Sequence, residues 1–148
     1  MKKLIIHTDG GSRGNPGPAG IGVVISSDSG SVIFKAGKFI GRATNNQAEY
    51  EAVIFGLQQA KGIFKKNKAF KKHVQIYMDS ELVVKQMNHE YKIENSNIQP
   101  LFLKVWNLML SFDSVKFIAI PREKNQEADK LANQAMDEQE KSQGLPGI

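Results

Sequence analysis

Cysteine is absent from this chain of 148 residues, which excludes disulfide bonds, thiolate metal sites and a cysteine nucleophile. No apolar run approaches the ~18 residues that a membrane-spanning helix needs, and the first residues, MKKLIIH, are too short and too soon charged for a signal peptide. The motifs of dinucleotide-binding enzymes, P-loop NTPases and Ser-His-Asp hydrolases are also missing. We therefore expect a soluble, cytoplasmic protein with no membrane partner.

Positive charge is concentrated in one half of the chain. Residues 1–74 hold 12 Lys and Arg against 4 Asp and Glu, whereas residues 75–148 hold 8 against 11, which together give a net charge of +5. A basic protein often binds a polyanion. The lysine-rich stretch from Lys61 to Lys72 is either a surface for salt-sensitive phosphate contacts or a solvated helix end, and the sequence leaves both readings open.

Apolar periodicity and turn residues predict an α/β domain. Runs of apolar and β-branched residues predict strands at 4–8, 21–25, 32–40, 74–78 and 115–120. Helical spacing predicts helices at 45–62, just after Ser80, at 101–110 and at 123–137. This order indicates a mixed sheet with helices covering its faces. We assign residues 1–137 to a single domain and residues 138–148 to a short C-terminal tail.

Four acidic residues stand where solvated surface charge is a poor explanation. Asp9 and Asp79 follow predicted strands, while Glu49 and Asp129 lie beside the apolar residues of predicted helices. Ligand sites form at the carboxyl ends of neighbouring strands, and an acid facing a core is costly unless it is paired or binds metal. Four converging carboxylates without His or Cys would suit Mg²⁺ or Mn²⁺. Spacing alone does not establish that they converge.

Four motif blocks resemble those of type 1 ribonucleases H. The blocks are DGGSRGNPGPAG at residues 9–20, TNNQAE at 44–49, DS at 79–80 and NQEADKLA at 125–132. All four occur in the family's order, and the resemblance covers residues 4 to about 135. It implies the ribonuclease H-like α/β fold, a five-stranded mixed sheet with helices on both faces.

The resemblance also implies an activity and a set of site residues. It implies an endonuclease that hydrolyses the RNA strand of an RNA–DNA hybrid and leaves 3′-hydroxyl and 5′-phosphate ends. Asp9, Glu49, Asp79 and Asp129 would be the catalytic residues and would hold two Mg²⁺ ions, with Mn²⁺ as a substitute. Two such ions about 4 Å apart can activate a water and stabilise the leaving oxygen. The protein is expected to be a monomer.

Small and polar residues of the same blocks are candidate substrate contacts. Gly10 and Gly11 lack side chains beside the first acid, so a nucleic-acid backbone could approach and meet peptide groups. Backbone groups can also read the 2′-hydroxyl that distinguishes RNA from DNA. The remaining candidates are Asn15, Thr44, Asn45, Asn46 and Ser80. Their structural alternatives are a turn, a helix cap and a loop.

The chain departs from the family's pattern in two places. Many bacterial members carry a flexible His in the loop before the last acid, whereas this loop contains Arg122. Arg122 is therefore a candidate catalytic residue that would hold a phosphate, although a plain surface Arg is an equal alternative. Members with an Arg here sometimes also cut double-stranded RNA. The basic, Trp-rich handle of some members is absent, because residues 88–95 are short and near neutral.

Other readings remain open at this level. A non-catalytic module of the same fold would bind hybrids without cutting them, and the presence of all four acids disfavours it. A transposase or integrase relative is disfavoured by the missing flanking DNA-binding domains. We expect His7 to be a buried core residue, and Trp106 to pack with Leu103 and Leu110 rather than stack on bases.

Overall fold

The computed structural model describes residues 3–143 and contains one five-stranded sheet in the order β3-β2-β1-β4-β5. The first three strands form an antiparallel meander, and β4 and β5 run parallel to β1. Their bounds are Lys3–Ser12 for β1, Gly17–Ser27 for β2, Val32–Ala43 for β3, His73–Met78 for β4 and Ser114–Ala119 for β5. The predicted mixed sheet is confirmed.

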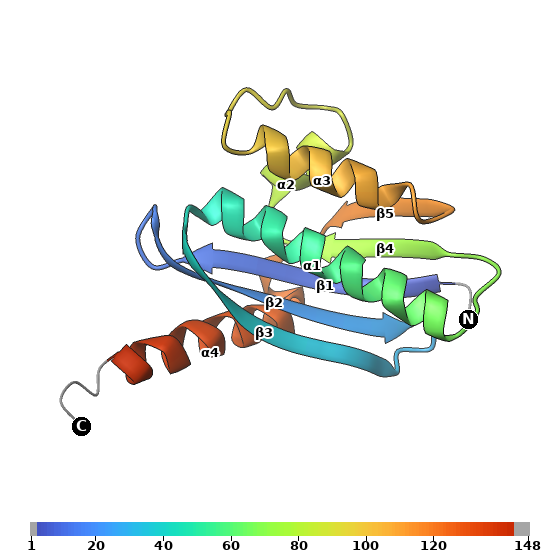
Figure 1. Cartoon of the computed structure of the whole chain (residues 1–148), viewed down its shortest axis with the longest axis horizontal. Coiled ribbons are helices and arrows are strands. Elements are labelled where there is room, and N and C mark those ends of the chain that lie inside the picture. The colour runs from blue at the N-terminus through green and yellow to red at the C-terminus, as the bar shows by residue number, and fades with distance from the viewer. Residues whose placement is uncertain (1–2, 144–148) are drawn as a thin grey trace.

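Helices cover both faces of this sheet (Figure 1). Three of them, α1 (Asn45–Lys66), α2 (Glu81–Met87) and α3 (Gln99–Met109), lie on one face, and α4 (Gln126–Gln143) packs against β2 and β3 on the other. A short 3₁₀ helix, η1 (Arg122–Lys124), precedes α4. Because β2 has a helix on each side, its residues from Ala19 to Ile25 are buried without alternation.

The principal core lies between the sheet and α1. Leu4 and Ile6 of β1 pack there with Val53 and Leu57 of α1 and Ile76 of β4, and all five side chains are fully buried. Successive residues of a strand face opposite sides, so the alternation of buried and half-buried residues in β1 assigns Leu4, Ile6 and Thr8 to the α1 side.

Glycines let both covering helices approach the sheet closely. A Cβ on Gly10 of β1 would lie 2.3 Å from the carbonyl oxygen of Ala48 in α1. On the other face, a Cβ on Gly22 of β2 would lie 1.9 Å from the carbonyl oxygen of Ala128 in α4. The helix backbones therefore occupy the space where side chains would otherwise stand.

Several predicted boundaries shift. The first helix continues past the exposed Gly62 to Lys66. The last helix begins at Gln126 rather than at Glu123, because η1 and Asn125 intervene, and it continues beyond residue 137 to Gln143. Residues 138–143 of the expected tail are thus helical, and the rest of that tail lies outside the described residues. The segment between α2 and α3 contains no helix, in agreement with the absence of a handle.

Two packing predictions are wrong. Trp106, Leu103 and Leu110 are 46%, 56% and 70% exposed, because α3 buries the face that carries Val105 instead. His7 is only half-buried and stacks on Tyr77 with a ring-centroid distance of 5.3 Å. Its side chain is on the α4 side of the sheet, where it lines a pocket with Glu127 and Ala128 of α4.

None of the helices in the described part of the chain combines the length and the apolar character that crossing a lipid bilayer requires.

Substitution of Gly22 by alanine tests the close approach of α4. The new methyl group would meet the α4 backbone, which cannot move aside like a flexible side chain. We expect the free energy of unfolding to fall by about 2 kcal/mol or more, measured by urea denaturation. Gly62→Ala is the matched control: it lies in a helix with open space around it and should stabilise by about 0.5–1 kcal/mol. Equal effects of the two substitutions would contradict the packing role of Gly22.

Candidate active site

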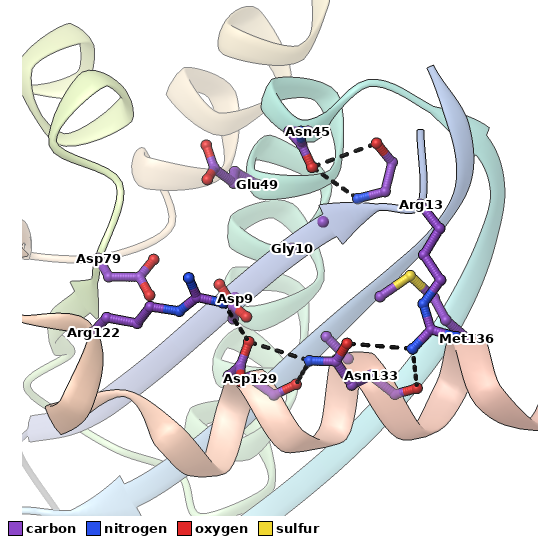
Figure 2. Close-up of a pocket in the computed structure, with 13 residues that line it drawn as sticks. Asp9, Gly10, Arg13, Asn45, Glu49, Asp79, Arg122, Asp129, Asn133 and Met136 are labelled. Atoms are coloured by element: carbon purple, nitrogen blue, oxygen red, sulfur yellow. Dashed lines mark hydrogen bonds and ion pairs between the residues drawn. The ribbon is translucent and has the colours of Figure 1, made fainter. Parts of the chain in front are cut away.

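One cleft of about 430 Å³ brings together the four predicted acids (Figure 2). Asp9, Glu49, Asp79, Asp129 and Arg122 all line it. The other lining residues are Gly10, Gly11, Ser12, Arg13, Asn45, Ala132, Asn133 and Met136. The convergence that spacing alone left open is therefore present in the fold.

Four different elements deliver these carboxylates. Asp9 belongs to the C-terminal half of β1, and Asp79 follows the end of β4, which is the parallel neighbour of β1. Glu49 lies in the second turn of α1, and Asp129 lies in the first turn of α4. Figure 2 shows Glu49 and Asp129 entering the cleft from these two helices, with Asp9 between them.

A capping box fixes the start of α1 and so the position of Glu49. The Thr44 hydroxyl accepts a hydrogen bond from the Gln47 backbone N–H at 3.1 Å, and the Gln47 side chain accepts one from the Thr44 N–H at 2.8 Å. This pair satisfies two helix-terminal donors that would otherwise be unpaired. Thr44 thus has the structural role that the sequence left as an alternative.

Asn125 is a positioning residue to which sequence reasoning gave no role. Its side chain is 1% exposed, and its Nδ2 donates to the Thr8 carbonyl at 2.9 Å, directly before Asp9. Its backbone carbonyl accepts the N–H of Asp129 at 3.2 Å. Its side chain also acts to lower the pKa of Asp79, which favours the ionised form of that carboxyl. Its signal in the sequence was its place at the start of the fourth motif block, residues 125–132.

Asn133 hydrogen-bonds Asp129, and Arg13 connects β1 to the same helix. The Asn133 Nδ2 donates to the Asp129 carbonyl at 3.0 Å and to its Oδ1 at 3.2 Å. Arg13, in the β1–β2 connection, forms ion pairs with Asp137 at 2.7 Å and Glu140 at 2.9 Å on α4. Helical i, i+4 spacing could have suggested the Asp129–Asn133 contact, but nothing in the sequence linked Arg13 to α4.

Burial and repulsion raise the pKa values of Asp9, Glu49 and Asp79 and so make these three acids hard to ionise. Burial, followed by the charges of Asp79, Asp129 and Glu49, raises the pKa of Asp9 to about 8. Burial raises the pKa of Glu49 to about 7, although a hydrogen bond from Ser80 opposes the shift. The pKa of Asp79 is also raised, mainly by burial, while the charge of Arg122 opposes that shift. A cation among these groups would relieve the repulsion.

The donor set fits a hard divalent cation. All four acids present oxygen atoms, and no His or Cys lines the cleft, a combination that suits Mg²⁺ or Mn²⁺. Within residues 3–143, no three side chains already stand close enough together to form a group that could hold one metal ion.

The predicted substrate contacts divide into two groups. Gly10, Gly11 and Asn45 line the cleft, whereas Asn15, Thr44, Asn46 and Ser80 are not among its lining residues. Asn15 Oδ1 accepts the Asn45 N–H at 3.0 Å, and the Ser80 hydroxyl accepts the Val83 N–H at 3.3 Å at the start of α2. The missing Cβ of Gly10 makes room for α1, and contact of its backbone with substrate stays a prediction.

Comparison with known proteins identifies the family. A family model described as reverse transcriptase-like matches residues 7–135. The solved RNase H1 of the archaeon Halobacterium salinarum aligns with a TM-score of 0.85 and 36% identity, over 92% of this chain and 98% of that one. LC11-RNase H1, solved in complex with an RNA/DNA hybrid, gives a TM-score of 0.86 and 43% identity over 91% and 97%.

The chain belongs to the type 1 ribonuclease H family. A bifunctional protein of Mycobacterium tuberculosis is 41% identical over 136 residues, which are 91% of this chain but 36% of that relative. The chain therefore spans about a third of the length of the mycobacterial relatives it matches.

Neutralising Asp9 of this ribonuclease H-family cleft should stabilise the metal-free protein. A raised native pKa means that the folded state binds a proton that the unfolded state releases, so stability falls as pH rises from about 4 to about 8. Asp9→Asn removes this loss and should raise the free energy of unfolding by about 2 kcal/mol or more near pH 8 in EDTA, since each unit of pKa shift corresponds to about 1.4 kcal/mol. Urea denaturation across this pH range measures the effect.

Asp28→Asn is the control, because Asp28 is exposed and lies in the β2–β3 turn. It should leave stability unchanged to within about 0.5 kcal/mol. A metal-free Asp9→Asn protein that is less stable than the unsubstituted protein near pH 8 would show that Asp9 does not carry the repulsion.

Proposed function

We propose that this chain is a metal-dependent endoribonuclease that hydrolyses the RNA strand of RNA–DNA hybrids and leaves 3′-hydroxyl and 5′-phosphate ends. The observation that supports it is the convergence of Asp9, Glu49, Asp79 and Asp129 in one cleft. Membership of the type 1 ribonuclease H family and the hybrid bound to LC11-RNase H1 support the substrate class.

The four carboxylates would hold two Mg²⁺ ions, with Mn²⁺ as a substitute. Bound divalent ions supply a Lewis acid and an activated water for phosphodiester hydrolysis. The chain's own residues orient the ligands: Asn125 holds β1 beside Asp9 and the helix that carries Asp129, while Asn133 hydrogen-bonds the Asp129 carboxylate. Burial keeps the carboxylates in a site of low dielectric, where their attraction for cations is strong.

A second groove offers a place for the other strand of the duplex. It has a volume of about 520 Å³ and is lined by residues of β3, the start of α1 and the segment before α3. Lys38 and Arg42 supply positive charge there, and Asn97 adds an amide. Gln47 and Glu51, which flank Glu49 on α1, also line it, so the groove and the cleft share the first turns of one helix. Cationic and amide groups in this position suit phosphate contacts.

Arg122 is suited to hold a phosphate at the mouth of the cleft. Its side chain is 80% exposed, and its guanidinium lies 4.0 Å from the Asp129 carboxylate. A guanidinium remains charged at neutral pH, so it offers planar donors to phosphate oxygens and cannot transfer a proton. Through this contact Arg122 would also support cleavage of double-stranded RNA.

A cleavage assay tests the proposed reaction. RNA labelled at one end, in a hybrid with DNA, should be cut internally in Mg²⁺ or Mn²⁺ but not in EDTA, and the products should carry 3′-hydroxyl and 5′-phosphate ends. Asp9→Asn should reduce kcat by a factor of about 10³ or more, as expected for a lost transition-state contact of ~4 kcal/mol. Parallel reactions with double-stranded RNA and double-stranded DNA define the substrate range.

The same assay separates the enzyme from a hybrid-binding module of the same fold. A module would bind the hybrid with equal affinity in EDTA and in Mg²⁺, and the unsubstituted protein and the Asp9→Asn variant would both leave the RNA intact. That result would refute the proposed activity.

Arg122→Gln tests the phosphate contact. We expect KM for the hybrid to rise about tenfold, which corresponds to about 1.4 kcal/mol of binding, with kcat within about threefold, because the contact forms in both the bound and the transition state. Lys124→Gln is the matched control, since Lys124 is an exposed cation on the same 3₁₀ helix but does not line the cleft. If both substitutions change KM equally, Arg122 acts only through net charge.

A further inference from the structure

A second cationic surface lies at the far end of the molecule from the cleft. We define the distal lysine patch as Lys65, Lys66, Lys68, Phe70 and Lys71, all exposed, at the end of α1 and in its connection to β4. Lys66 lies 17 positions after Glu49 on α1, which corresponds to about 25 Å along the helix. In Figure 1 this connection lies at the end of the sheet opposite to the one where β1 points.

This position separates the patch from the candidate active site. The strand β4 begins next to the patch at His73 and ends at Met78, one residue before Asp79. Nucleotides held in the cleft therefore cannot also contact these lysines. The sequence left open whether the lysine-rich stretch contacts phosphates or is a solvated helix end. If it contacts phosphates, these must belong to a different segment of nucleic acid from the one in the cleft.

The positive charge of the patch is not neutralised locally. Residues 61–72 contain six lysines and no acid. Among residues 3–143, none of these lysines takes part in an ion pair. The neighbouring Asp113 accepts the backbone N–H of Lys72 at 2.7 Å. A cluster of unpaired like charges raises the local concentration of anions, above all of polyanions.

An aromatic ring stands among these charges. Phe70 is 92% exposed, and the Lys71 ammonium lies 5.8 Å from its ring centroid. Burying such a side chain would contribute about 1.5–3 kcal/mol to folding, so this ring gives up stability in the free protein. An exposed ring beside cations is the combination that binds single strands, where unpaired bases stack and phosphates meet the lysines.

We propose that the distal lysine patch binds single-stranded nucleic acid, with a base stacked on Phe70 and phosphates on Lys65, Lys66, Lys68 and Lys71. A duplex does not fit this role, because its bases are already stacked on each other. A membrane is also a poor partner, because binding at a membrane surface usually requires a continuous apolar helix face and the patch offers one isolated ring. The inference extends the proposed function, because it assigns a site to single-stranded segments that flank a hybrid.

Binding measurements in EDTA test the patch without any cleavage. Fluorescence anisotropy with oligothymidylate and oligouridylate of about 12 nucleotides would be recorded between about 50 and 200 mM salt. Replacing the four lysines of the patch by Gln should reduce the slope of log Kd against log salt by about 2–3, at about 0.7 per lost phosphate contact. Phe70→Ala should weaken binding about fivefold or more and leave the salt slope unchanged.

A second quadruple Gln variant, at the exposed Lys92, Lys104, Lys116 and Lys141, removes the same charge elsewhere. It should retain the salt slope of the unsubstituted protein. Equal losses in both quadruple variants, or no loss on substitution of the patch, would overturn the proposal. Binding of the patch to phosphatidylserine vesicles but not to either oligonucleotide would also overturn it, in favour of a membrane surface.

Cleavage of a short blunt hybrid by the same variants keeps the two proposals apart. The patch variants should cut this substrate as fast as the unsubstituted protein does. If the unsubstituted protein fails to cut it, the proposed function fails, while the anisotropy data still decide whether the patch binds single strands.

Discussion

Asp9 lies between two helices, α1 and α4, that approach the sheet so closely that only glycine fits at the points of contact. Its partner in the β1–β2 register is Gly22, whose missing Cβ makes room for the α4 backbone at Ala128, one residue before Asp129. The next residue, Gly10, makes the same room for α1 at Ala48, one residue before Glu49. The contacts that pack each helix onto the sheet therefore also place its acid beside Asp9. The composition of the cleft follows from this packing constraint.

The same convergence works against folding. Four acids in one half-buried cleft repel each other, and burial raises the pKa of Asp9 to about 8 and that of Glu49 to about 7. The fold retains them because the core between β1 and α1 and the hydrogen bonds of Asn125 hold the backbone in place. Local instability of this kind is common at functional sites, where surrounding packing offsets it. Divalent cations would convert the repulsion into attraction.

Sequence reasoning located the features that local pattern determines. Strand and helix types follow from apolar periodicity, and the four motif blocks identify the acids before any coordinates are known. It misplaced the features that depend on tertiary packing. The face of α3 that carries Trp106 is exposed because the face with Leu101, Phe102 and Val105 packs against the core, and apolar residues stand on both faces of this helix. The packing of Gly10 against Ala48 was missed because the two residues are 38 positions apart in the sequence. The ion pairs of Arg13 with α4 join residues more than 120 positions apart.

The uneven charge of the chain acquires a spatial meaning in this fold. The long helix α1 joins the two regions, because it carries Glu49 near its start and Lys65 and Lys66 at its end. The molecule is thus negative at the cleft and positive at the distal patch. Monovalent salt weakens attraction to the positive surfaces by screening, whereas divalent cations remove the negative barrier at the cleft. Monovalent salt should therefore weaken the association with a polyanion, whereas divalent cations should promote the reaction in the cleft.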